Sequence, residues 1–207
     1  MASVSQSVSQ LKRAPSVEGV LPVFLDRWSA RAFSDQPVSP ADLKKIFEAA
    51  RWAPSAYNEQ PWRFIVGVAG TETHKKLAAV LISFNQLWAP KAPVLILGIA
   101  KSNFSHNDTA NAYALYDLGA ATASLSLQAA ALGLSTHQMA GFDHDAARKA
   151  LAIPQDYTLG AITALGYPGE PDALGDEKLV GMEKSPRSRK ALGEIALSAW
   201  DQSAKLG

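Results

Sequence analysis

The stretch from Arg51 to Phe64 constrains the fold most strongly, because a helical pattern stops and a strand-like pattern begins within a few residues. Pro54 and Pro61 bracket the turn. Proline fixes its own φ and biases the preceding residue away from the α conformation, so we expect a rigid loop. Its polar residues suit a binding loop. The alternative is that Asn58 and Gln60 only satisfy the backbone of the turn. The polar residues of the loop are Ser55, Tyr57, Asn58 and Gln60.

Hydrophobic periodicity predicts interleaved helices and strands along the rest of the chain. Ser39-Pro40-Ala41-Asp42 is a strong helix start, with a serine cap, proline at the first position and an acid in the first turn. The predicted elements are a short helix after Pro22, a helix from Pro40 that ends before Pro54, strands at 64–69, 93–100 and 157–166, an extended piece at 135–140, and helices at 71–87, from Asp108 or Thr109 to about Leu132, and from Asp143 to Leu151.

The remaining segments are assigned by composition. Residues 1–18 lack a period and predict a mobile N-terminal extension. Residues 167–185 are rich in Gly, Pro and charge, which indicates a surface loop, and residues 187–200 are a basic entry followed by an apolar tail. Since no repeat or linker is visible, residues 19–207 are predicted to form a single α+β domain.

The longest predicted helix, which ends near Leu132, consists almost entirely of Ala, Leu, Ser, Thr and Gly. A helix with so little charged surface is expected to be enclosed on most sides. A central core helix explains this composition, and an extensive subunit interface explains it equally well. Gly133 is predicted to end the helix.

Composition narrows the class of partner. Of the 207 residues 47% are apolar, which indicates a globular protein, and 20 basic residues stand against 19 acidic ones without a block of like charge. Neither nucleic acid nor a membrane surface is therefore an expected partner, and small molecules are favoured. There is no cysteine, and the four histidines lack the spacing of a metal site, so no metal is predicted. An N-terminus without an apolar segment predicts a cytoplasmic protein.

Two clusters of arginine suggest a phosphate group. Arg27-Trp-Ser-Ala-Arg31 places two guanidinium groups and a hydroxyl within five residues, and Arg187-Ser-Arg189 repeats the arrangement far along the chain. Guanidinium groups bind phosphate oxygens bidentately, so both clusters converging on one phosphate is one interpretation. A pair of solvated basic turns is the other.

Familiar catalytic motifs are absent from the sequence. It contains no G-x-S-x-G, no Walker loop and no G-x-G-x-x-G, which removes support for hydrolase, P-loop and Rossmann chemistry. Asp143 and Asp145 flank a helix start and are interpreted as caps rather than as an acid and base.

Taken together, the motifs resemble the FMN-dependent nitroreductase family. The resemblance rests on four motifs in order, which cover nearly the whole chain after residue 20: Arg27-Trp-Ser-Ala-Arg31, Ala53-Pro-Ser-Ala-Tyr-Asn-Glu-Gln-Pro-Trp62, Gly141-Phe-Asp143 and Arg187-Ser-Arg189. It implies a nitroreductase-like central sheet flanked by helices, and an intertwined homodimer with FMN at the subunit interface.

The resemblance also implies roles for particular residues, none of them a catalytic side chain. One set would hold the phosphate and ribityl chain, a second would reach the flavin from the partner subunit, and a third would lie beside the flavin ring, where a backbone N–H faces the reactive nitrogen. In that order the sets are Arg27, Trp28, Ser29, Arg31, Arg187 and Arg189; Pro54, Ser55, Ala56 and Asn58; and Asn85, Met139, Ala140 and Gly141.

The implied activity is reduction of nitroaromatics, quinones or similar small acceptors by ping-pong hydride transfer from NADH or NADPH. Two residues depart from the family pattern: Ala56 replaces a second hydroxyl, and Ala140 stands where some members carry glutamate. These departures leave open a flavin-binding or flavin-sequestering protein with little turnover. A flavoenzyme of other chemistry on the same fold is a further alternative.

Overall fold

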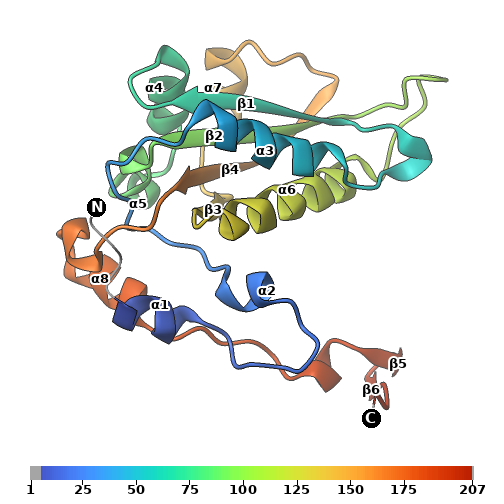
Figure 1. Cartoon of the computed structure of the whole chain (residues 1–207). Helices are drawn as coiled ribbons and strands as arrows, with labels where there is room; N and C mark the ends of the chain where they lie inside the picture. Colours follow the sequence, from blue (N-terminus) through green and yellow to red (C-terminus); the bar gives the residue numbers. More distant parts are fainter. Residues whose placement is uncertain (1–5, 207) are drawn as a thin grey trace.

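The computed structural model describes residues 6–206, and its centre is a four-stranded antiparallel sheet in the order β1-β2-β4-β3 (Figure 1). A separate hairpin, β5–β6, lies near the C-terminus. The architecture is the α+β sheet flanked by helices that the sequence predicts. The strands are β1 Trp62–Val68, β2 Val94–Lys101, β3 Ser135–Met139, β4 Tyr157–Gly166, β5 Leu197–Ala199 and β6 Gln202–Ser203.

Helices cover both faces of the sheet. Figure 1 shows α4 and α7 above the sheet and α6 below it, with α3 in front. Further from the sheet, α1, α2 and the C-terminal hairpin run below α6. The helices are α1 Gln6–Lys12, α2 Pro22–Asp26, α3 Pro40–Arg51, α4 Glu72–Ala79, α5 Ser83–Gln86, α6 Ala114–Ala131, α7 His144–Ala150 and α8 Glu177–Lys184, and the 3-10 turns are η1 Ala56–Asn58, η2 Ala89–Lys91, η3 Pro171–Leu174 and η4 Leu192–Glu194.

Strand β2 shows how the sheet divides the core in two. Successive side chains of a strand point to opposite faces. Leu95 and Leu97 accordingly join the cluster that includes Leu77 of α4, whereas Val94 and Ile96 join the cluster on the side of α3 and α6. Because both faces are covered, nearly every residue of β2 is buried, which explains its continuous apolar run.

Two glycines allow α6 to approach the sheet closely. A Cβ built on Gly98 would lie 3.2 Å from Leu118 of α6, and one on Gly160 would lie 2.7 Å from the same side chain. Leu118 therefore occupies the space that side chains on these two strands would need, close to the register shift in β2 between Leu97 and Ile99.

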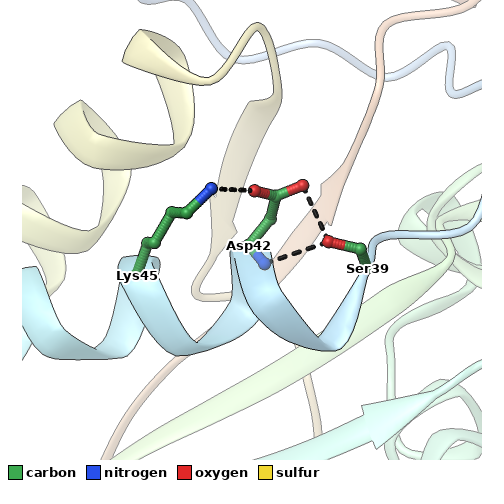
Figure 2. Close-up of polar contacts among 3 residues, drawn as sticks. All are labelled: Ser39, Asp42 and Lys45. Carbon is green, nitrogen blue, oxygen red and sulfur yellow. Dashed lines mark hydrogen bonds and ion pairs between the residues drawn. The ribbon is translucent and has the colours of Figure 1, made fainter.

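Helix α3 begins as its sequence predicts. Ser39 is the N-cap, its hydroxyl oxygen accepts a hydrogen bond from the N–H of Asp42 at 3.0 Å, and Pro40 occupies the first helical position. Figure 2 shows the same hydroxyl beside the Asp42 carboxylate, at 2.8 Å, and Lys45 on the other carboxylate oxygen at 2.9 Å. These bonds lower the pKa of Asp42, the one from Lys45 most.

The cap gives a first prediction. Ser39→Ala leaves the N–H of Asp42 without its acceptor, so we expect the free energy of unfolding to fall by about 1 kcal/mol. Urea titration followed by circular dichroism measures it. Lys45→Ala removes only an exposed ion pair and should leave the midpoint nearly unchanged. Equal midpoints for Ser39→Ala and the wild type would show that the cap does not stabilise this helix.

The single helix predicted at residues 71–87 is wrong. The structure contains two shorter helices, α4 and α5, with extended residues between them. Leu81 forms a β-bridge with Phe142, the N–H of Ile82 donates to the carbonyl of Gly141 at 3.1 Å, and the carbonyl of Val80 accepts from Asp143. Pairing with a distant segment thus replaces the helical hydrogen bonds that the local pattern favours.

The start of α6 also differs from the prediction. It begins at Ala114, after an N-cap at Tyr113 that makes no side-chain cap bond, rather than at Asp108 or Thr109. Residues 102–111 fold back on themselves instead: Asn103 bridges Ala110, and Asp108 has a φ of 58°. The end of the helix is as predicted, with Gly133 at a φ of 78°.

Two terminal segments carry more structure than composition indicates. The stretch 167–185, predicted to be a surface loop, contains η3 and α8, and Leu179 and Glu183 of α8 are buried. Within the predicted extension 1–18, Val8 of α1 packs with Trp28 and Ala30, while residues 1–5 lie outside the described part. The mobility of this extension stays a prediction. Within residues 6–206, the structure contains no helix with the length and apolar character needed to cross a bilayer.

Candidate functional site

The segment 27–31 leaves α2 in an extended conformation and passes the edge strand β3. Nδ1 of His137 on β3 donates to the carbonyl of Ala30 at 3.1 Å. Burial, followed by the charge of Arg31, lowers the pKa of His137 to about 4, so the imidazole is neutral near pH 7. This hydrogen bond from the neutral imidazole connects the segment 27–31 to strand β3.

A cavity of about 400 Å³ opens between this segment, α6 and β3. Arg27 and Ser29 line it, as the predicted phosphate and ribityl segment would. Strand β3 contributes Thr136 and Gln138, which lie two positions apart and so share a face. The other lining residues, Phe24 of α2 and Ala123, Ser126 and Leu127 of α6, are apolar or small.

A second cavity, of about 420 Å³, shares Phe24 and Arg27 with the first. Four arginines line it. Burial, and then the charge of Arg189, lowers the pKa of Arg27, while burial followed by Arg27 lowers that of Arg187. Asp26 pairs with one of the four, Arg13, at 3.1 Å. The cluster carries excess positive charge and suits an anionic group. Its arginines are Arg13, Arg27, Arg187 and Arg189.

Arg187 contacts the backbone of the first cluster. Its two Nη atoms donate to the carbonyls of Leu25 and Arg27. Its Nε is buried and has no hydrogen-bond partner within the described residues. The fold thus brings the two arginine clusters together, and part of the Arg187 guanidinium serves to hold the segment in place.

Arg31 lies apart from this cluster. It lines a different cavity, of about 550 Å³, together with Ser34, Lys91 and Glu170. Its guanidinium carbon lies 5.9 Å from the ring centre of Trp88. The structure does not place Arg31 in the cavity of Arg27 and Ser29. Trp28 is buried, with the Nζ of Lys12 5.0 Å from its ring centre.

The loop after α3 is tightly folded. Tyr57, Asn58 and Gln60 have φ values of 53°, 56° and 52°, a conformation that is costly for residues other than glycine. The Ser55 hydroxyl accepts from the N–H of Gln60 at 3.0 Å, and the Gln60 side chain donates to the carbonyl of Asn58 at 2.9 Å. For Gln60, these bonds match the interpretation in which the residue satisfies backbone hydrogen bonds of the turn.

The first half of this loop faces α6. Pro54, Ser55 and Ala56 line a cavity of about 320 Å³ with Tyr113, Tyr116, Asp117 and Ala120. The buried carboxylate of Asp117 accepts from the N–H of Ala56 at 3.1 Å, which fixes the loop to the helix. Arg27 does not line this cavity. Within one chain, the loop residues and the arginine cluster therefore line different cavities.

A third group surrounds Gly141. The Asn85 side chain donates to the carbonyl of Gly141 at 3.0 Å. A Cβ on Gly141 would lie 2.5 Å from Ile82 and 2.9 Å from the Asn85 amide nitrogen, so glycine is needed for this approach. The Met139 side chain lies in the core, whereas Ala140 is exposed.

Several residues that line the first cavity are not among the predicted site residues. Gln138 was detectable, because it alternates with the buried Met139 at the end of a predicted strand. Phe24 and Ser126 carried no signal beyond helical spacing. Within residues 6–206, no group of three or more His, Asp or Glu side chains is arranged to hold a metal ion.

A family model described as the nitroreductase family matches residues 25–87 and 83–167. A protein of Archaeoglobus fulgidus with the provisional name NADH dehydrogenase/NAD(P)H nitroreductase is 34% identical, over 73% of this chain and 87% of its own length.

This chain is also similar in fold to solved structures. A crystal structure of an oxidoreductase containing FMN has a TM-score of 0.83 and 34% identity, and the match covers 89% of this chain and 94% of that one. A nitroreductase-type protein from Desulfovibrio desulfuricans, in complex with FMN, has a TM-score of 0.71 and 27% identity, with 89% and 98% covered.

Proposed function

This chain belongs to the nitroreductase family, and we propose that it is an FMN-dependent oxidoreductase that uses NADH or NADPH to reduce nitroaromatics, quinones or similar small acceptors. The observation that carries the proposal is the convergence of Arg27, Arg187 and Arg189 on one cavity, beside a second cavity that Arg27 and Ser29 share. The names of two similar solved structures mention FMN, which supports FMN as the cofactor.

The residues present fit a phosphate-bearing cofactor. The arginine cluster has excess positive charge, and the buried Nε of Arg187 has no partner among the described residues. We assign Arg27, Ser29, Arg187 and Arg189 to the phosphate and ribityl chain, with Trp28 as a buried support. Arg31 would serve a different part of the cofactor, since it lines a separate cavity. Asn85 and the backbone of Met139, Ala140 and Gly141 are assigned to the ring.

When bound, FMN would accept hydride from the nicotinamide and pass reducing equivalents to the acceptor by ping-pong turnover. The protein would bind, orient and shield the cofactor. We assign no side chain as acid, base or nucleophile. His137 is held neutral by burial and bonded to the Ala30 carbonyl, so its proton positions the segment rather than entering the reaction.

We further propose a homodimer in which Pro54, Ser55, Ala56 and Asn58 of one subunit reach the flavin of the other. Two observations support it. In one chain the loop and the arginine cluster line different cavities. One face of α6 is exposed yet uncharged, with Tyr116, Gly119 and Ala123 along it. The exposed tail, in which Trp200 is 91% exposed, would cover the partner.

The test is an anaerobic absorbance spectrum of the protein reconstituted with FMN, before and after NADPH and then NADH. We expect the flavin band to bleach and to return on adding a nitroaromatic or a quinone. A bound band that neither nucleotide bleaches would instead support a flavin-binding protein with little turnover, the alternative favoured by the missing side-chain groups at Ala56 and Ala140. Protein that takes up no FMN would refute both.

A further inference from the structure

Glu183 is a buried acid that the proposed function leaves unused. It lies in the last turn of α8, and its side chain is 1% exposed. Glutamate is almost never buried so completely without partners, because removing its charge from water is costly. Its position therefore calls for an interaction that offsets this cost.

The partners of Glu183 belong to the segment that lines the candidate site. Its Oε1 accepts from the N–H of Arg31 at 2.8 Å and from the N–H of Ala32 at 3.0 Å. Its Oε2 is buried without a hydrogen-bond partner within residues 6–206. Burial raises the pKa of Glu183, and the two N–H groups, Lys12 and Arg31 act against that rise.

Arg187, four residues later, holds the other end of the same segment. Its guanidinium donates to the carbonyls of Leu25 and Arg27. Glu183 thus accepts hydrogen bonds from N–H groups at one end of the segment, and Arg187 donates hydrogen bonds to carbonyls at the other end. Between these two points lies the stretch that carries Trp28 and Ser29.

Lys12 fixes the helix that carries Glu183. It is 6% exposed, and its Nζ donates to the carbonyls of Met182 at 3.1 Å and of Ser185 at 2.6 Å. A cation on the carbonyls at the end of a helix also interacts favourably with the helix dipole. Helix α1 is therefore joined through α8 to the segment 25–32.

We propose that Glu183 is a positioning residue for the cofactor pocket, which with Arg187 clamps residues 25–32 so that Arg27 and Ser29 face their cavity. The inference rests on the proposed function. Glu183 itself lines neither of the two cavities that Arg27 shares. Lys12 acts one step further out, by holding the end of α8.

The test compares Glu183→Gln with the wild type. Glutamine keeps an acceptor oxygen but loses the charge that strengthens both bonds, and it buries an N–H₂ group beside Lys12 and Arg31. We expect the dissociation constant of FMN, measured by quenching of flavin fluorescence, to rise at least tenfold. Hydrogen exchange at the amides of Arg31 and Ala32 should speed up while that of β2 stays unchanged. Glu177→Gln, an exposed acid on the same helix, should stay within twofold of the wild type.

Lys12→Met is the second variant, since it keeps an unbranched apolar side chain, one atom shorter, but removes the bonds to Met182 and Ser185. It should raise the dissociation constant at least threefold, and it decides the question if Glu183→Gln does not fold. FMN affinities of the folded variants within twofold of the wild type, with faster exchange at Arg31 and Ala32, would overturn the inference alone. A wild type that binds no FMN would overturn the proposed function and the inference with it.

Discussion

Replacing Arg27 and Arg187 together by alanine is expected to weaken FMN binding by roughly 2–5 kcal/mol, or about 30-fold to several thousand-fold in the dissociation constant. Both arginines line the same cavity, and burial lowers the pKa of each, so their charges are only partly screened by water. A phosphate that loses two such partners loses charge-assisted hydrogen bonds as well as Coulomb attraction. Fluorescence titration of the apoprotein with FMN measures the change.

The matched control for this variant is Lys45→Ala with Arg51→Ala. It removes the same formal charge from exposed positions on α3 and should leave the affinity unchanged. Riboflavin, which lacks the phosphate but keeps the ribityl chain, should lose less affinity than FMN for the Arg27 and Arg187 variant. An equal loss for riboflavin would show that Arg187 acts mainly by holding residues 25–27. Unchanged FMN affinity would show that neither arginine binds the phosphate.

Gly119→Glu is expected to abolish the proposed dimer while leaving the subunit folded. Gly119 is exposed on α6, and a Cβ built there meets nothing within 4 Å. Glutamate also favours a helix over glycine by about 0.5–1 kcal/mol. The single chain therefore tolerates the change, whereas a second subunit packed on this uncharged face does not. Size exclusion with light scattering should give about twice 22.0 kDa for the wild type and 22.0 kDa for the variant.

Gly181→Glu is the control, because Gly181 is also exposed, helical and free of neighbours around a Cβ. This variant should keep the assembly of the wild type. Circular dichroism should show equal helix content in all three proteins. A Gly119→Glu protein that still elutes as a dimer would place the interface elsewhere, and a wild type that is monomeric with FMN bound would refute the dimer.

Local signals in the sequence were the ones that predicted structure correctly. The Ser39 cap, the glycine that ends α6 and the apolar run of β2 each depend on a few neighbouring residues, and all three are confirmed. The break near Leu81 depends on pairing with Phe142, which no local pattern contains. Helix propensity favoured one long helix there, and tertiary pairing outweighed it.

The candidate site also combines features that the sequence predicts with features that it does not. Motif order pointed to the arginine clusters, and the fold does bring Arg27 of the first cluster and both arginines of the second to one cavity. The separate position of Arg31 was not visible in the sequence, because residues 27–31 have no regular secondary structure and so no period that predicts which side chains share a face. Glu183 was hidden for another reason. It stands in a segment rich in Gly, Pro and charge, where a buried acid looks the same as a solvated one.

The clamp on residues 25–32 has a consequence for the order of events during synthesis. Its hydrogen bonds join residues 151 to 162 positions apart in the chain. The four strands of the central sheet lie between residues 62 and 166 and are complete before Glu183 and Arg187 have been made. A nascent chain emerges from the ribosome with its N-terminus first. The sheet can therefore form while residues 25–32 still lack their hydrogen bonds to Glu183 and Arg187. If the clamp positions the cofactor pocket as proposed, we expect cofactor loading to follow the emergence of α8 from the ribosome.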